Sequence, residues 1–316
     1  MVPAKGAVTL APFIASLDLA LLFESLALGA AACWACASLL SAPAARHLGA
    51  FAFSRWRMAS VSLMLWSLSL LTGGWQSLSA GPAGIMMLSG LLGIFIGDTA
   101  LFAAMNRLGP RRATVLFAGH SLFSVVLGFL LLGETLAGQA LLGCSLVATG
   151  VMGAVFFGRR EGERHHWEQD NGKVAVGVAL GVLSAFCQAS ATLMVKPVMA
   201  TDIDAVSASA VRMSTALGAH LLLLWSGARV ARPIQAINWR ILAMVALNGF
   251  LAMGVGMTLI LIALRYGEVG LVAMLSSVSP VLILPLLWWV QKRPPAKGAW
   301  LGALATVLGT MLIVSR

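Results

Sequence analysis

The stretch that decides the fold is AGIMMLSGLLGIFIGDTALFAAMN, residues 83–106, in which Asp98 is the one charged residue. A helix of this length reaches about 36 Å, enough to cross a hydrocarbon core about 30 Å thick. Comparable runs recur from residue 24 to residue 314. The chain is therefore predicted to be an all-α integral membrane protein.

Composition supports a membrane as the solvent of this chain. Hydrophobic residues make up 59% of the sequence and charged residues only 10%, whereas soluble domains are about a quarter charged. Apolar runs bounded by charged residues, Gly and Pro predict ten transmembrane helices, at about residues 24–44, 53–72, 83–106, 112–132, 137–157, 174–195, 206–226, 240–263, 269–290 and 297–314.

The ten predicted helices form two related sets of five. Arg57-Met58-Ala59-Ser60 matches Arg212-Met213-Ser214-Thr215, and Arg107-Leu108-Gly109 matches Arg265-Tyr266-Gly267. Because five is odd, the second set enters the membrane from the opposite side, the inverted-repeat plan of many secondary transporters. The predicted units are a lead-in, a first repeat, a polar linker and a second repeat, at residues 1–23, 24–157, 158–173 and 174–316.

The net charge of +10 lies in the connections between apolar runs. Nucleic-acid binding would need these charges on one face, with aromatic platforms between them, so we expect the lipid bilayer as partner and no nucleic acid. Alternate connections hold 16 of the 21 Lys and Arg residues. By the positive-inside rule these connections are cytoplasmic, which places both termini outside.

Three stretches resemble the EamA-type branch of the drug/metabolite transporter (DMT) superfamily. They are Gly97–Phe102 running into Arg107-Leu108-Gly109, Phe129–Leu136, and Ser279-Pro280-Val281 with the glycine-spaced last helix. The resemblance implies a ten-helix carrier with a central cavity, often an exporter of amino acids, metabolites or drugs. It also implies cytoplasmic termini, against the charge count.

The same resemblance marks Gly133, Glu134 and Pro280 as family motif residues, which we interpret as structural. Glu134 is expected to favour the start of the next helix through its dipole. The second half departs from the motif, because Gln291-Lys292 replaces Gly-Glu there. Close approach of helix backbones is predicted at glycines 90, 93, 97, 249, 254 and 256.

Asp98 is the first functional candidate, since an acid inside a membrane helix is costly unless it is paired, hydrated or protonated. Counted from the turn near Leu108, Asp98 and His120 lie at similar depth on adjacent antiparallel helices. They are predicted as a proton-coupling pair. The alternative is a structural hydrogen bond between these helices.

Six further residues are candidates for substrate binding. Arg57 and Arg212 occupy equivalent positions near helix starts, so each could meet an anionic group at one mouth of a cavity, or could instead snorkel to headgroups. The others are polar or aromatic residues predicted to line a cavity or to join helices, namely Trp34, Gln188, Ser121 and Ser279.

The predicted function is a secondary active transporter, which exports small metabolites such as amino acids or amphiphilic drugs by proton-coupled alternating access. The chain has no GxxxxGK[ST] motif, no HExxH and no nucleophile elbow, so we expect no catalysis, cofactor or metal. The alternatives are a nucleotide-sugar-like exchanger and a non-transporting receptor or scaffold. We expect a multi-pass protein of the inner (cell) membrane, as a monomer or homodimer.

Overall fold

A computed structural model describes residues 11–108, 113, 116–135, 138–157, 174–291 and 297–314. Helices and their connections make up the whole of these ranges, in which there is no strand. The first half contains α1 (Ala11–Leu48), α2 (Ala50–Thr72), η1 (Gly74–Ser77), α3 (Ala80–Ser89), η2 (Gly90–Asp98), α4 (Thr99–Leu108), α6 (His120–Leu132) and α7 (Gln139–Phe157).

The second half repeats this order of elements. It contains α8 (Val174–Met199), α9 (Ala205–Trp225), η3 (Arg229–Ala231), α10 (Trp239–Gly249), η4 (Phe250–Gly256), α11 (Met257–Tyr266), α12 (Val269–Ser276), α13 (Ser279–Gln291) and α14 (Lys297–Val314). Each of the ten segments predicted from sequence is mainly helical where the structure describes it, with turns at Gly119 and at residues 277–278.

One predicted boundary differs from the structure, and another lies outside the described residues. Helix α1 begins at Ala11 and runs without interruption to Leu48, so the boundary expected between residues 23 and 24 falls inside a continuous helix. The reason is local composition, because residues 11–23 are mostly Ala, Leu and other residues that continue a helix readily. The predicted linker, residues 158–173, lies outside the described residues.

Five helical segments in the described ranges are long and apolar enough to cross a membrane. They are Leu21–Ser41, Ala80–Met105, Val174–Met199, Trp239–Tyr266 and Val269–Leu286, and shorter apolar helices cover Leu116–Leu132, Gln139–Gly153 and Lys297–Ile313. Helices α2 and α9 are not among them, because they are rich in serine and carry arginine. Fully exposed leucines such as Leu71 suit a surface that faces lipid.

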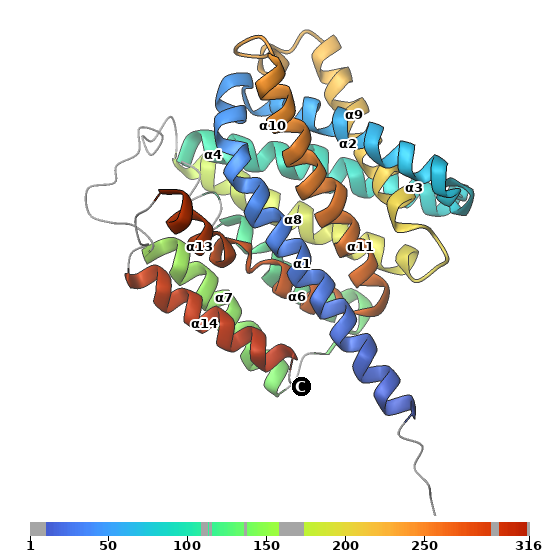
Figure 1. Cartoon of the computed structure of the whole chain (residues 1–316), viewed down its shortest axis with the longest axis vertical. Helices are drawn as coiled ribbons and strands as arrows, with labels where there is room; N and C mark the ends of the chain where they lie inside the picture. Colours follow the sequence, from blue (N-terminus) through green and yellow to red (C-terminus); the bar gives the residue numbers. More distant parts are fainter. Residues whose placement is uncertain are drawn as a thin grey trace, which may run out of the picture.

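Helices α7 and α14 lie side by side and form the most extensive helix pair of the fold (Figure 1). Glycines allow their backbones to touch. A Cβ on Gly143 would lie 2.8 Å from the Gly309 carbonyl oxygen, and a Cβ on Gly150 would lie 2.7 Å from that of Gly302. Gly143 and Gly150 correspond in the second half to Gly302 and Gly309, and the shared role of these four glycines is close packing.

Both long central helices change to a π-helix halfway, at η2 in the first half and at η4 in the second. The wider i→i+5 turn is rare, and it occurs most often at functional sites. Each segment is glycine-rich, and each packs against a helix of the other half. A Cβ on Gly90 would lie 2.5 Å from the carbonyl oxygen of Arg212, and one on Gly249 would lie 3.3 Å from that of Arg57. A glycine of each half thus packs against the matching arginine of the other half.

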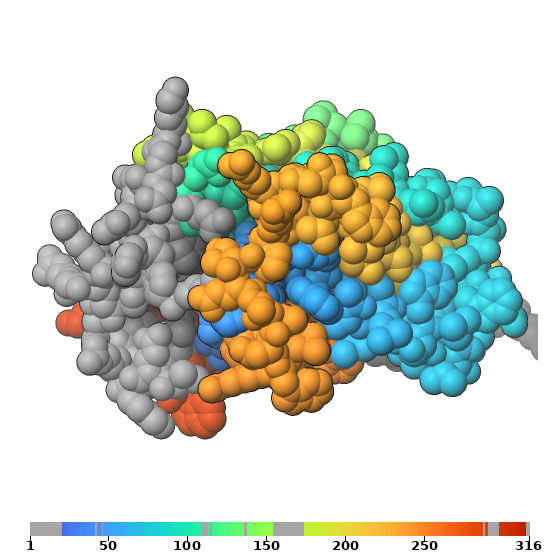
Figure 2. All heavy atoms as spheres, turned by 90° about the horizontal axis from the view of Figure 1, so that it is seen from above, coloured from blue at the N-terminus to red at the C-terminus, as the bar shows by residue number. Residues whose placement is uncertain are grey.

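At one end of the molecule the segment between α9 and α10 covers the start of α2 (Figure 2). The Ile234 amide donates to the Leu48 carbonyl over 3.0 Å, and the Arg55 guanidinium donates to the Ala231 carbonyl over 2.8 Å. These bonds join the first half of the chain to the second.

Candidate functional site

A buried ion pair lies in the middle of the fold. Arg57 of α2 donates from Nη2 to the Oδ2 atom of Asp98, the last residue of η2, over 2.7 Å. Their side chains keep only 6% and 12% of their surface exposed. In a low-dielectric interior such a pair holds two helices together. Removal of either partner would leave the other charge buried and uncompensated.

Two aromatic rings hold the guanidinium of Arg57 in place. Its central carbon lies 5.4 Å from the ring centre of Phe53 and 5.5 Å from that of Phe102. The two rings contact each other edge to face, with centres 5.9 Å apart. Both distances are within the range of cation–π attraction. Arg57 therefore has an anionic partner and an aromatic clamp.

Arg212 of α9 is the second arginine near this carboxylate. It is 1% exposed and interacts electrostatically with Asp98. Its Nε and Nη2 atoms find no hydrogen-bond partner among the described residues. The Nη2 atom lies 3.8 Å from the position that a Cβ on Gly93 would take, and Gln188 Oε1 lies 3.5 Å from the same position. A Cβ on Gly93 would also lie 2.7 Å from the Cβ of Ala191, so glycine here allows η2 to pack closely against α8.

Asp98 therefore has a different partner from the one predicted from sequence. The predicted partner of Asp98 was His120, but its ion pair is with Arg57. His120 is buried against the ring of Phe117, with ring centres 5.1 Å apart. A role of either residue in proton coupling stays a prediction.

Arg57 and Arg212 were expected at opposite mouths of a cavity. Both are instead buried, and both act on the same carboxylate. Each lies about two turns from the start of its helix, and a long arginine side chain can cover the remaining distance to the interior. Solute binding by these two residues stays a prediction.

The remaining candidates contribute to the packing of helices. The indole N–H of Trp34 donates to the Ala252 carbonyl in η4 over 2.8 Å, which ties α1 to the second π-helix. Ser121 is buried, and its hydroxyl donates to the Ala118 carbonyl in the preceding turn. Gln188 is buried beside Gly93, as described above, while Ser279 is half-buried at the start of α13. Their roles toward a substrate stay predictions.

The Gly133-Glu134 motif joins the two halves. Gly133 ends α6 with φ 68°, a backbone conformation that favours glycine. The turn brings Glu134 to the start of α12, where its carboxylate accepts hydrogen bonds from the amides of Val269 and Gly270 over 2.8 and 3.2 Å. The expected partner was the following helix, α7. The structure shows that Glu134 caps a helix of the other half.

Pro280 lies in the first turn of α13, where a proline needs no amide partner. The turn before it, at residues 277–278, separates α12 from α13. The first half has a turn at Gly119 in the equivalent place, although Leu122 stands where the resemblance expects proline. The break therefore occurs in both halves and does not depend on the proline.

Sequence reasoning missed two groups of residues, one beside the site and one at the ends of α8 and α11. His220 is buried on α9, packs edge-on against Phe95 with ring centres 5.0 Å apart, and interacts electrostatically with Arg57. It follows Arg212 by eight residues, so helical spacing already placed both on one face. The second group consists of reciprocal caps, in which Lys196 donates to the Leu264 carbonyl and Arg265 to that of Met199.

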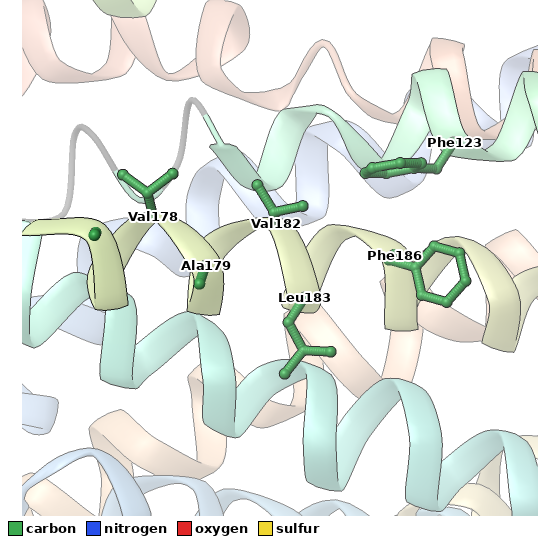
Figure 3. A pocket seen from close by; sticks show the side chains of 7 residues that line it. Phe123, Val178, Ala179, Val182, Leu183 and Phe186 are labelled. Carbon is green, nitrogen blue, oxygen red and sulfur yellow. The ribbon is translucent and has the colours of Figure 1, made fainter.

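A separate open groove lies between α6 and α8 and is lined by apolar side chains (Figure 3). Phe123 and Phe186 close one end of it, with ring centres 5.8 Å apart at an angle of 89°. Val178, Val182 and Leu183 continue the lining along α8. These side chains offer no charge and no hydrogen bond, so the groove suits lipid rather than a polar solute.

Comparison with known proteins identifies the family. The model of the EamA-like transporter family matches residues 21–156 and 175–315, which are two repeats within one chain. The chain belongs to the EamA-like transporter family. The resemblance seen in the sequence is thereby confirmed, and this EamA-like chain is a multi-pass membrane protein of a transporter family.

Other comparisons bear on the fold alone. No curated protein matches this EamA-like chain. A solved structure described as "Crystal structure of protein" matches with a TM-score of 0.74 and 16% sequence identity, over 92% of this chain and 95% of that one. At this identity the likeness shows a shared fold and carries nothing about substrate.

Proposed function

We propose that this EamA-like protein is a secondary active transporter in which ten membrane-crossing helices form two inverted five-helix repeats. Membership of the family supports transport. The contacts of Gly90 with Arg212 and of Gly249 with Arg57 support the inversion, because in each a glycine at the start of a π-helix packs against the equivalent arginine of the other half. A carrier built in this way alternates access by moving one repeat against the other.

The observation that carries the proposal is the charged group Arg57, Asp98 and Arg212. It draws on both halves, and it is buried where the two π-helices and their partner helices meet. Charged residues inside a membrane protein are costly, and by default they mark a solute or ion path. The solute is a small molecule that meets this group, and Asp98 is the residue that takes up and releases a proton.

The test is solute flux into proteoliposomes that contain the purified protein, with and without a pH gradient. Amino acids, nucleosides and cationic drugs form the first panel, chosen by the shift in melting temperature that each causes. Asp98→Asn should abolish the response to the pH gradient while the protein stays folded. Asp202→Asn, an exposed acid after α8, is the matched control. Full gradient-driven flux in Asp98→Asn would refute the role of Asp98.

The location is proposed to be the inner (cell) membrane, with both termini outside as the charge count predicts. A fluorescent protein that matures only in the cytoplasm, fused to the C-terminus, should remain dark. Strong fluorescence would show that the termini are cytoplasmic, as the family resemblance implies. The outcome fixes the side on which the end covered by residues 226–238 lies.

A further inference from the structure

The two equivalent arginines of the charged group are in different situations. Arg57 has an ion pair with Asp98 and lies between two aromatic rings. In the second half the positions that match Phe53 and Phe102 are occupied by the aliphatic residues Ala208 and Ile260. Among the described residues, Arg212 therefore lacks aromatic rings at the positions that clamp Arg57. Its interaction with Asp98 is electrostatic, without a direct hydrogen bond.

Charge also remains unbalanced within the group. Arg57 pairs with the Asp98 carboxylate and Arg212 interacts electrostatically with it, so the three buried groups together carry a net charge of about +1. Burial of a charged group is expensive unless it is paired and hydrogen-bonded. Arg212, 1% exposed and with Nε and Nη2 lacking partners among the described residues, is the group that is short of an anion.

We propose that Arg212 binds a carboxylate of the transported solute, an inference that rests on the proposed function. A guanidinium presents a planar fork of N–H donors that matches the two oxygens of a carboxylate. Gln188 Oε1 lies in the same neighbourhood, 3.5 Å from the position that a Cβ on Gly93 would take, and Arg212 Nη2 lies 3.8 Å from that position. The Gln188 amide is placed to accept a hydrogen bond from a second polar group of the same solute.

Binding of such a solute involves Asp98. Among the charged and titratable groups that face Asp98 are Arg57 from α2 and Arg212 from α9, while His220, also on α9, faces Arg57. A solute carboxylate on Arg212 would repel the Asp98 carboxylate, since both would share the same two cations. A proton taken from water onto Asp98 removes this repulsion.

Proton and solute therefore favour each other's binding, and the effect is reciprocal by linkage. One proton and one carboxylate enter the group together, which is the thermodynamic basis of symport. An inward proton gradient then drives uptake of the acid. Export, the direction that the family resemblance suggests, runs down the solute's own gradient and takes a proton along.

The experiment compares acids with their uncharged amides on the purified full-length protein in detergent. The probes are acetate and acetamide, benzoate and benzamide, and N-acetylphenylalanine and its amide. At least one acid should raise the melting temperature where its amide does not. The exposed Arg229 supplies the control. Arg229→Gln should keep this response and Arg212→Gln should lose it. Arg212→Lys should bind about tenfold more weakly, as expected for the loss of one charge-assisted hydrogen bond.

A pH indicator in weakly buffered solution measures the proton uptake that should accompany binding of the acid. Addition of the active acid should remove about one proton per bound anion from the solution with wild type, and none with Asp98→Asn. Release of protons, an equal response to acids and amides, or no response to any acid overturns the proposal. If the protein transports solutes other than acids, the proposed function holds and only the role of Arg212 is wrong. If no solute is transported, the proposed function itself is wrong.

Discussion

Replacing Asp98 by Asn should lower the stability of the protein without unfolding it. The substitution keeps the shape of the side chain and removes the one anion between Arg57 and Arg212. Charge centres about 4 Å apart interact by about 4 kcal/mol at an effective dielectric constant of about 20. Breaking a buried pair costs about 3–5 kcal/mol, because the remaining charge stays buried. We expect a loss of about 3 kcal/mol in the free energy of unfolding.

The assay is unfolding in mixed micelles titrated with SDS, followed by tryptophan fluorescence. A double-mutant cycle with Arg57→Met isolates the pair, since the double variant removes both charges. We expect a coupling energy of about 2 kcal/mol. Asp202→Asn, at an exposed acid, should leave the unfolding curve unchanged. Strictly additive single variants, or an Asp98→Asn curve that overlays this control, would refute the reasoning.

Three other changes test the fold around the site by the same unfolding assay. Glu134→Gln should cost about 1 kcal/mol by weakening the cap of α12, while Thr135→Ala, at the exposed neighbour, should cost nothing measurable. Gly90→Ala should lower the free energy of unfolding by about 1–3 kcal/mol, because the added Cβ meets the backbone of α9. Gly84→Ala, where a Cβ meets open space, should be neutral or slightly stabilising. Equal effects of the two substitutions would contradict the close approach of η2 to α9. Trp34→Phe should cost about 1 kcal/mol by removing its hydrogen bond to η4, and an unchanged curve would show that the bond contributes nothing.

Much of the architecture was accessible from sequence because a bilayer restricts the alternatives. Length and apolar character located helical segments throughout, and the match of Arg57 with Arg212 identified two equivalent positions that meet at one carboxylate. The start of α1 was placed too late. Hydropathy measures where a chain can cross a membrane, and a helix can continue beyond that point.

The partners of the charged residues were beyond the sequence for a geometric reason. Hydropathy gives the depth of Asp98 but not the direction in which its side chain points. The π-helix η2 just before it widens the turn and rotates later side chains relative to an ordinary α-helix. The same limit applies to Glu134, because neighbours in sequence suggested α7, whereas neighbours in space supply α12.

The unequal surroundings of the two arginines have an energetic consequence for the transport cycle. In a carrier whose halves were identical, exchange of their roles would convert the outward-open state into the inward-open state at no cost. Here the ion pair and its aromatic clamp belong to Arg57, while glycine stands at the position that matches Asp98. In the proposed alternating-access cycle the two states would then differ in free energy, so the empty protein would rest with one side open more often than the other. Its affinity for solute accordingly differs between the two faces of the membrane.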